Sequence, residues 1–379
     1  MDNSAHPRPT RITVDLTRLA GNLDAIRART RTAVMAVVKA NAYGHGMLPV
    51  ARQLQASGVD QLGVALLEEG IALRAGGVHV PILVFGGIVG EQLDDFFHHG
   101  LQITVSSLAK LRQVEAAAAR LGQRAKIHLK VDTGMERVGT HSDTCGPLVE
   151  AALAADCCDI AGIYSHLACS DEPDHPMTAQ QLQRFHDACA HFTRLGAPMP
   201  VRHLANSGGI LHSPDSWLDM VRPGILLYGV LPGDAARPLP GIQPVLSLRS
   251  QVVYFKVVGA GHPVSYGATW VPQGATRVVT VQMGYGDGWP RSLSSEGEVL
   301  IGGQRYPIAG RVCMDQFMVD IGQGTAYNGD AVVLVGEQGA ERIGIEEVAR
   351  RAGTIPYEIL VRLNERIPRR YVGSTASDN

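Results

Sequence analysis

The stretch TAVMAVVKANAYGHG, residues 32–46, decides how the rest of the chain is understood. Ala33 to Val38 is an unbroken apolar run, which is typical of a parallel strand buried on both faces. The run ends at Lys39, and a polar loop with Tyr43 and His45 follows it. Because α/β folds keep their chemistry at the carboxyl ends of such strands, Lys39 is a candidate catalytic residue. Taken alone, a lysine that leaves the core for solvent is the more ordinary explanation.

Seven further short apolar segments predict strands downstream of the first, and helical patterns separate most of them. Alternation of strands and helices indicates parallel pairing. Eight such units within about 215 residues are typical of a (β/α)8 TIM barrel, and a doubly wound open sheet is the alternative. The predicted strands are 33–38, 61–66, 80–85, 101–105, 125–131, 159–164, 201–205 and 219–228.

The sequence pattern changes at 231–244, a segment rich in Pro and Gly without periodicity. The chain after it is rich in Val, Thr and Tyr and carries turn dipeptides such as Gly302-Gly303. A length of 379 residues also exceeds most single cores. We therefore expect an α/β barrel domain followed by a mainly β domain. The expected bounds are 13–240 for the barrel and 241–379 for the β domain.

Composition and charge disfavour several classes of partner. The formal net charge is −2 and no long basic run is present, so neither nucleic acid nor an anionic membrane is expected as a partner. The first ten residues lack the apolar core of a secretory signal, and no run of about 18 apolar residues could span a bilayer. The six cysteines show no CxxC pairing and fit reduced thiols, and no metal site is expected. These features predict a cytoplasmic protein.

Loops of small residues follow the last two predicted strands, at the edge where Lys39 would lie. One contains Asn206 and Ser207, and the other runs from Arg222 through Gly224 to Ile225. Backbone N–H groups in such loops can approach a phosphate. A lysine and a phosphate cradle on one rim suggest pyridoxal phosphate (PLP), which needs a Schiff-base lysine, a phosphate anchor and a residue facing the pyridine nitrogen. Arg222 could face that nitrogen, and since a guanidinium cannot accept a proton, the ring would be a weaker electron sink.

Three more charged or titratable residues are candidates for the same edge. His166, after the sixth predicted strand, could orient Arg222, although a core histidine is the ordinary explanation. Lys130 lies inside a strand-like run, so its charge would have to be paired or chemically altered. Arg137 lies in the following loop and could hold a carboxylate or a phenolate oxygen. An outward Lys130 and a surface Arg137 are the alternatives.

Nine distinctive motifs span nearly the whole chain: AVVKANAYGHG (36–46), HLKVDTGMERVG (128–139), SHLA (165–168), HLANSGG (203–209), RPGILLYG (222–229), VSYGATW (264–270), GYGDGWPR (284–291), GRVCMDQFMVD (310–320) and GTIPYE (353–358). In this order they resemble the alanine racemase family. The resemblance implies a PLP-dependent isomerase that interconverts L-alanine and D-alanine, for supply of D-alanine to peptidoglycan or for its catabolism. It also implies a homodimer in which each site combines one barrel with the partner's β domain, and residues 1–12 packed on the β domain.

The resemblance assigns roles to individual residues. Lys39 would carry PLP, and Lys39 and Tyr266 would be the two opposed bases. Arg137 and Met314 would bind the substrate carboxylate. Residues expected to contact the cofactor are Lys39, Tyr43, Arg137, His166, Asn206, Ser207, Arg222, Gly224, Ile225 and Tyr357. Supporting residues would be Lys130, which matches a lysine often carbamylated in the family, and Tyr285, Cys313 and Asp315. Tyr266, Tyr285, Cys313, Met314 and Asp315 would come from the partner subunit.

Three alternatives remain open from the sequence. A PLP decarboxylase of the same fold type would be expected to carry an acidic pyridine partner in place of Arg222. A non-enzymatic PLP carrier would not need the β domain. A racemase that also acts on other amino acids, such as serine, would differ in the pocket width near Tyr285 and Tyr357, which a sequence does not give.

Overall fold

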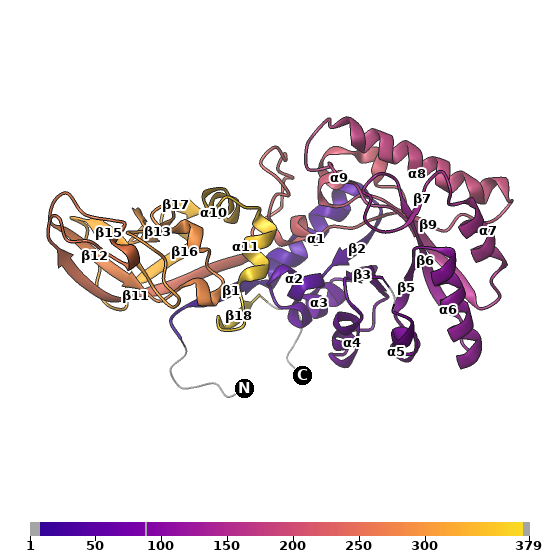
Figure 1. Ribbon diagram of the computed structural model, residues 1–379, viewed down its shortest axis with the longest axis horizontal. Helices are drawn as coiled ribbons and strands as arrows, with labels where there is room; N and C mark the ends of the chain where they lie inside the picture. The colour runs from indigo at the N-terminus through magenta and orange to yellow at the C-terminus, as the bar shows by residue number, and fades with distance from the viewer. Residues whose placement is uncertain (1–7, 88, 374–379) are drawn as a thin grey trace. The chain divides into compact units, whose positions relative to one another are not determined.

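The computed structural model describes residues 8–87 and 89–373 (Figure 1). The chain forms two compact units. One contains 18–42 and 47–243, and the other contains, among the described residues, 8–17, 43–46 and 244–373. None of the helices in these described ranges is both long and apolar enough to cross a membrane.

Eight parallel strands form the centre of the first unit, which confirms the predicted (β/α)8 barrel. Backbone hydrogen bonds from Asp219 N to Arg202 O (3.1 Å) and from Arg222 N to Ala205 O (2.9 Å) connect the last strand to the first, so the sheet nearly closes. The strands, in hydrogen-bonding order, are β10 (Met220–Val221), β2 (Ala33–Val37), β3 (Gln61–Val64), β4 (Ile82–Val84), β5 (Gln102–Val105), β6 (Ala125–Asp132), β8 (Cys158–Tyr164) and β9 (Val201–His203). A short strand, β7 (Thr140–His141), pairs with β6 outside this order.

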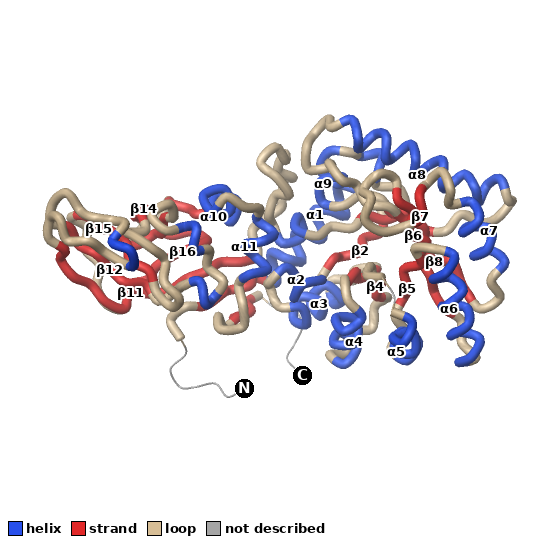
Figure 2. The backbone as a smooth tube through the Cα atoms, viewed as in Figure 1, coloured by secondary structure: helices blue, strands red, loops and turns tan. Residues whose placement is uncertain are grey.

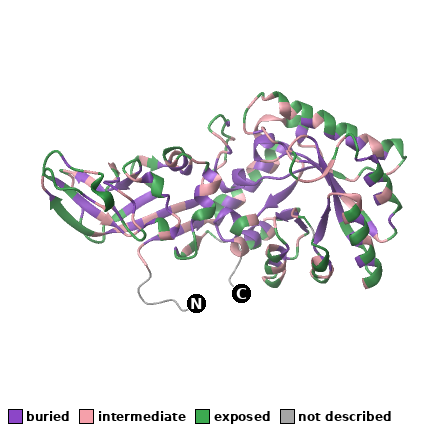
Figure 3. Cartoon of the chain, viewed as in Figure 1, coloured by how far each residue is buried: buried purple, intermediate pink, exposed green. Residues whose placement is uncertain are grey.

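Helices follow most barrel strands and lie outside the sheet (Figure 2). The helix Leu108–Leu121 carries clear signals at both ends: the Ser107 hydroxyl accepts a hydrogen bond from Lys110 N (3.3 Å), and Gly122 adopts a left-handed φ of 63°. Figure 3 shows the strands buried and the outer helix faces exposed. The helices are α1 (Leu16–Thr30), α3 (Met47–Ala56), α4 (Leu67–Ala75), α5 (Leu93–His98), α6 (Leu108–Leu121), α7 (Gly146–Ala154), α8 (Pro176–Arg194) and α9 (Ser207–His212).

The predicted strand 219–228 is wrong beyond Val221. Only Met220–Val221 pairs as a strand, and Ile225–Tyr228 forms a 3-10 helix. Pro223 has no N–H to offer a sheet, and the Ser207 hydroxyl accepts the N–H groups of Gly224 (3.1 Å) and Leu226 (3.2 Å). The apolar run therefore packs in the core as a turn.

The second unit is built on a mainly antiparallel sheet with the order β14-β13-β16-β11-β1-β18, and β12 pairs with both β11 and β15. Gly302 and Gly303 have φ values of 60° and 79° and form the predicted two-residue hairpin between β13 and β14. The elements are β1 (Arg11–Asp15), β11 (Leu246–Val258), β12 (Thr276–Val281), β13 (Glu298–Ile301), β14 (Gln304–Pro307), β15 (Phe317–Gly322), β16 (Ala331–Gln338), β17 (Glu341–Ile343), β18 (Arg369–Val372), α10 (Ile345–Ala352) and α11 (Pro356–Arg362).

Two short segments group with the second unit, whereas the sequence led us to expect the barrel to begin at residue 13. β1 pairs antiparallel with β11 and parallel with β18, so residues 11–15 belong to the β sheet; residues 1–7 lie outside the described range. Residues 43–46 also belong to this unit. Arg369 Nε donates to Gly44 O (2.8 Å), and the Tyr371 hydroxyl donates to His45 O (3.2 Å).

Candidate active site

Lys39 begins a left-handed turn, α2 (Lys39–Tyr43), at the carboxyl end of β2. The φ values of Ala40, Asn41, Ala42 and Tyr43 lie between 52° and 55°, a conformation that costs roughly 1–2 kcal/mol per L-residue. Side-chain acceptors hold the turn: Glu69 Oε1 accepts from Ala40 N (2.6 Å), and Asn41 Oδ1 accepts from Met47 N (2.8 Å). This support keeps Lys39 at a fixed place on the barrel rim.

The Lys39 amine is half-buried and carries a lowered pKa. Burial is the main cause, the positive charge of Arg137 adds to it, and Glu69 acts in the opposite direction. A lysine in this state holds more of the neutral amine near neutral pH than a surface lysine does. The amine can therefore act as a nucleophile or as a base.

Arg222 is buried in the barrel interior, where backbone carbonyls and histidines surround its guanidinium. Nη1 donates to His203 O (2.6 Å) and to His203 Nδ1 (3.1 Å), and Nη2 donates to Ser165 O (2.7 Å), Leu204 O (3.0 Å) and His166 Nδ1 (3.3 Å). Among the described residues, none accepts a hydrogen bond from Nε. The predicted contact between His166 and Arg222 is present, and the Nε–H of Arg222 remains for a ligand.

Lys130 is buried and has no carboxylate within ion-pair distance among the described residues. Its Nζ donates to Val131 O (3.1 Å) and lies 5.1 Å from the centre of the Tyr164 ring. Burial, followed by the charge of Arg222, lowers the pKa of Lys130 to about 7. The outward orientation considered for this lysine is wrong, because the side chain is buried, and its lowered pKa leaves much of the amine uncharged at neutral pH.

Asp132 shapes the loop that carries Arg137. Its carboxylate accepts backbone N–H groups from Gly134 (2.8 Å), Met135 (3.0 Å) and Arg137 (3.1 Å). Burial acts to raise the pKa of Asp132, but backbone N–H donors of this loop and the charge of Lys130 bring it below its ordinary value. The Arg137 guanidinium lowers the pKa values of Lys39, Lys130 and His166, so its charge faces the same end of the barrel.

Ser207 connects the two loops of small residues, and Asn206 supports the first of them. Asn206 Oδ1 accepts from Gly209 N (3.0 Å) and from the Ser170 hydroxyl (2.6 Å). Ser207 Oγ accepts the N–H of Gly224, so the hydroxyl hydrogen is left to donate elsewhere. Ile225 begins a 3-10 helix and its N–H has no partner within that helix. These donors are suited to an anion.

The second unit brings the other predicted residues together. The ring centres of Tyr43 and Tyr357 lie 6.0 Å apart, and burial together with Tyr357 raises the pKa of Tyr43. Tyr285 N donates to Cys313 O (3.0 Å), which fixes the Tyr285 turn against the segment that contains Met314. Tyr266, Tyr285 and Met314 have exposed fractions of 72%, 42% and 53%.

Two polar contacts organise the loops around these residues. The Ser265 hydroxyl donates to Arg311 O (2.7 Å) and lies 3.6 Å from Cys313 Sγ, which ties the Tyr266 turn to the Cys313 segment. Arg366 Nη2 pairs with Asp315 Oδ1 at 2.5 Å. The predicted residues of the β domain thus form one exposed cluster.

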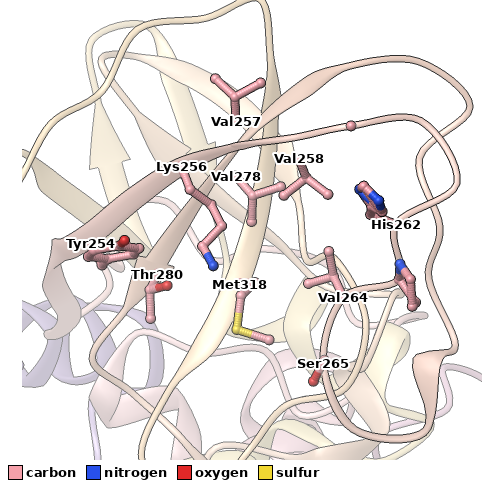
Figure 4. A pocket seen from close by; sticks show the side chains of 12 residues that line it. Tyr254, Lys256, Val257, Val258, His262, Val264, Ser265, Val278, Thr280 and Met318 are labelled. Carbon is pink, nitrogen blue, oxygen red and sulfur yellow. The ribbon is translucent and has the colours of Figure 1, made fainter.

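A cavity of about 460 Å³ opens beside Ser265 in the same unit (Figure 4). Tyr254 and Thr280 lie on one side of it, and Val258 and Val264 lie on the other. It contains none of the predicted site residues. We therefore do not assign the reaction to this cavity.

Three residues of the barrel site were not predicted. Glu69 supports the Lys39 turn, His203 accepts from Arg222, and Tyr164 lies beneath both Lys130 and Arg222. His203 lies inside the predicted strand 201–205. A polar residue within a predicted buried strand is the signal that could have pointed to it. In the described part of the chain, no cluster of three or more His, Cys, Asp or Glu is placed to hold a metal ion.

Comparison with known proteins gives one consistent result. The family model "Alanine racemase, N-terminal domain" matches residues 14–232, and "Alanine racemase, C-terminal domain" matches residues 245–371. The protein named alanine racemase from Symbiobacterium thermophilum is 40% identical over 371 residues, which are 97% of this chain and 98% of that protein. The alanine racemase from Thermobifida fusca is 40% identical over 95% of this chain and 97% of its own length.

Solved structures agree with this result. The crystal structure of alanine racemase from D-cycloserine producing Streptomyces lavendulae matches with a TM-score of 0.93 at 40% identity, covering 97% of this chain and 98% of that one. The biosynthetic alanine racemase from Pseudomonas aeruginosa matches with a TM-score of 0.87 at 35% identity, over 97% of this chain and 100% of that one.

Proposed function

The chain belongs to the alanine racemase family, and from this premise we propose that it interconverts L-alanine and D-alanine with PLP held by Lys39. The observation that carries the proposal is the common placement of Lys39 and Arg222. Val37 N donates to Pro223 O (3.0 Å), so the strand that leads to Lys39 is bonded to the residue that follows Arg222. A nucleophilic amine and a buried cation thus lie at the same end of the barrel.

The barrel residues fit PLP in three respects. Arg222 keeps its Nε hydrogen for an acceptor such as the pyridine nitrogen. Ser207, with Asn206 holding its loop, Gly224 and Ile225 offer hydrogen-bond donors that suit a phosphate. Tyr43 and Tyr357 are proposed to complete the phosphate site. When bound, PLP would supply the electron sink that stabilises the carbanion formed at the substrate α-carbon.

The residues of the chain would carry the protons. We assign Lys39 to one face of the α-carbon, where its amine takes the proton of D-alanine, and Tyr266 to the opposite face, where its phenolate takes the proton of L-alanine. A positioned acid or base typically contributes about 10²–10⁴-fold to a proton transfer. His166 faces Arg222 and is kept uncharged, because burial and the nearby cations hold its pKa well below the usual value.

The remaining polar residues would bind the substrate and orient the binding groups. Arg137 and Met314 are proposed to bind the alanine carboxylate. Carbamylation of Lys130 would replace an unpaired cation with an anion that positions Arg137. The lowered pKa of Lys130 supports this, because the neutral amine is the form that reacts with carbon dioxide.

We propose a homodimer in which the partner's β domain supplies the second base. The exposure of Tyr266 and Met314 supports this assembly, since both would be covered by a partner, together with Tyr285, Cys313 and Asp315. The exposed end of β11, with Phe255 and Val257, gives the same unit an apolar surface for the contact. A cytoplasmic location stays a prediction from the sequence.

Circular dichroism of L-alanine and L-serine with the purified, PLP-loaded protein tests the function. We expect the alanine signal to decay to zero, as for a racemic mixture, and serine to change far more slowly. Equal rates would identify a broader amino-acid racemase, and an unchanged alanine signal would refute the proposal. Lys39→Ala should lose PLP absorbance, whereas Tyr266→Phe should keep it and lose turnover of L-alanine.

A further inference from the structure

A continuous row of buried polar groups leads away from Arg222 through the barrel interior. Arg222 Nη1 lies 3.1 Å from His203 Nδ1, and His203 Nε2 lies 2.9 Å from His128 Nδ1. His128 Nε2 lies 2.7 Å from Gln102 Oε1, which also accepts from Gln61 Nε2 at 2.7 Å. All five side chains are buried. Of these five residues, only Arg222 has a role in the reaction proposed above.

The row crosses the inside of the barrel. Gln61, Gln102, His128 and His203 come from β3, β5, β6 and β9 (Figure 1). Neither β3 and β5 nor β6 and β9 are neighbours in the sheet, so these hydrogen bonds must span the interior. Gly162 makes room for them, because a Cβ at that position would lie 2.4 Å from His128 Nδ1.

The known donor at one end and the acceptor at the other fix the direction of every bond. A guanidinium only donates, so His203 Nδ1 must be bare and its Nε2 must carry the hydrogen. His128 Nδ1 must then accept, and its Nε2–H donates to the Gln102 carbonyl oxygen. Protonation of either ring would place one N–H against another. Burial accordingly lowers the pKa of His128 to about 3 and that of His203 well below its usual value, with Arg222 as the second cause.

We propose that Gln102, His128 and His203 form a one-way hydrogen-bond relay that positions the Arg222 guanidinium toward the pyridine nitrogen of the cofactor. The inference rests on the function proposed above. Hydrogen bonds that point the same way polarise one another, so the Gln102 acceptor strengthens the hold of His203 on Arg222. Tyr164 supports the arrangement: its ring stacks on His203 with centres 4.8 Å apart, and its hydroxyl bonds to Thr104 (2.8 Å). His128, His203 and Gln102 are positioning residues.

Nitrogen-15 NMR of the histidine rings tests the relay without turnover. In the protein without PLP, His128 and His203 should each show a protonated Nε2 and a bare Nδ1, unchanged between pH 6 and pH 9. His128→Phe and His203→Phe assign the signals. A protonated Nδ1 on His203, or a doubly protonated ring at pH 7, would overturn the proposal.

Cofactor affinity provides the second readout. Gln102→Met removes the acceptor at the end of the relay and should weaken PLP binding about tenfold, as expected for the loss of one buried hydrogen bond near a charge. Gln53→Met is the matched control, because Gln53 is also a buried glutamine, lies in α3 and is outside the relay. Equal weakening in both variants would show a general packing effect and refute the relay.

The two readouts separate this inference from the proposed function. If the histidine rings show the expected protonation but the protein does not racemise alanine, the proposed function fails and the hydrogen-bond direction stands. If alanine is racemised and Gln102→Met binds PLP as tightly as the unchanged protein, the relay fails and the function stands.

Discussion

The Glu69 carboxylate accepts a hydrogen bond of 2.6 Å from the backbone N–H of Ala40, the residue directly after Lys39. Its second oxygen accepts from Ala65 N (2.8 Å) and Leu66 N (3.1 Å), at the start of α4. One carboxylate thus connects the first helical turn of α4 to the strained turn at the candidate nucleophile. Glu69 also opposes the lowering of the Lys39 pKa by burial and by Arg137.

Glu69→Gln should therefore lower the pKa of Lys39 further and loosen its turn. The amide keeps the side-chain shape but replaces an acceptor oxygen with a donor that faces backbone N–H groups. The pH dependence of modification of the Lys39 amine, followed by mass spectrometry on the protein without PLP, measures this pKa. An unchanged or higher pKa would contradict the role of Glu69. Glu68→Gln, one residue earlier in the same helical turn, is the control.

The left-handed turn predicts an unusual effect of glycine. Ala40 is exposed and has a φ of 52°, so Ala40→Gly should raise the free energy of unfolding by up to about 1 kcal/mol, because glycine adopts this conformation without the penalty of a Cβ. Ala116→Gly, at an exposed position of the right-handed helix α6, should instead lower it by about 1 kcal/mol. Denaturant titration measures both, and equal signs would show that the turn is unstrained.

Lys130 should make stability depend on pH. Burial lowers the pKa of this amine to about 7 in the folded protein, while in the unfolded chain the amine keeps the ordinary lysine pKa of 10.5. Between these values the unfolded state binds more protons, so the free energy of unfolding should rise with pH across the window. Urea titrations at pH 7.5 and pH 9.5 should show a smaller rise in Lys130→Met than in the unchanged protein. An identical rise would place the Lys130 amine in water.

A buried ion pair connects the N-terminal segment to the Tyr285 turn. Arg8 donates to both oxygens of Asp287 at 2.6 and 2.7 Å, and Asp287 is fully buried. Asp287→Asn should lower the free energy of unfolding by roughly 3 kcal/mol, since it leaves Arg8 without its charge partner. Arg8→Met combined with Asp287→Asn should cost less than the sum of the single changes. If the two changes in the free energy of unfolding were strictly additive, the interaction between Arg8 and Asp287 would not contribute to stability.

Local patterns predicted the parts of the fold that depend on neighbouring residues. The apolar run before Lys39 predicted β2, and the alternation of strands and helices predicted the barrel. The run at 219–228 was misinterpreted, because periodicity cannot separate a short buried strand from a buried 3-10 helix. The Ser207 hydroxyl that shapes this turn lies in another segment of the chain, so a local pattern does not reveal its contact with the turn.

The candidate site shows the same limit. Motifs identified Lys39 and Arg222, but the groups that support them come from distant positions. His128 and His203 are 75 residues apart, and Glu69 is 29 residues from Ala40. A sequence gives no sign that such side chains will meet. The polar residues inside predicted strands were the available signal, and of these only Lys130 was used.

The division of the chain between its units has a consequence for biosynthesis. Within the described residues, the chain passes from one unit to the other four times, after Thr17, Ala42, Gly46 and Gln243. β1 is translated near the start, yet its sheet partners β11 and β18 leave the ribosome only after the barrel residues. The part of the β sheet that contains β1 can therefore form only after the barrel residues have been translated.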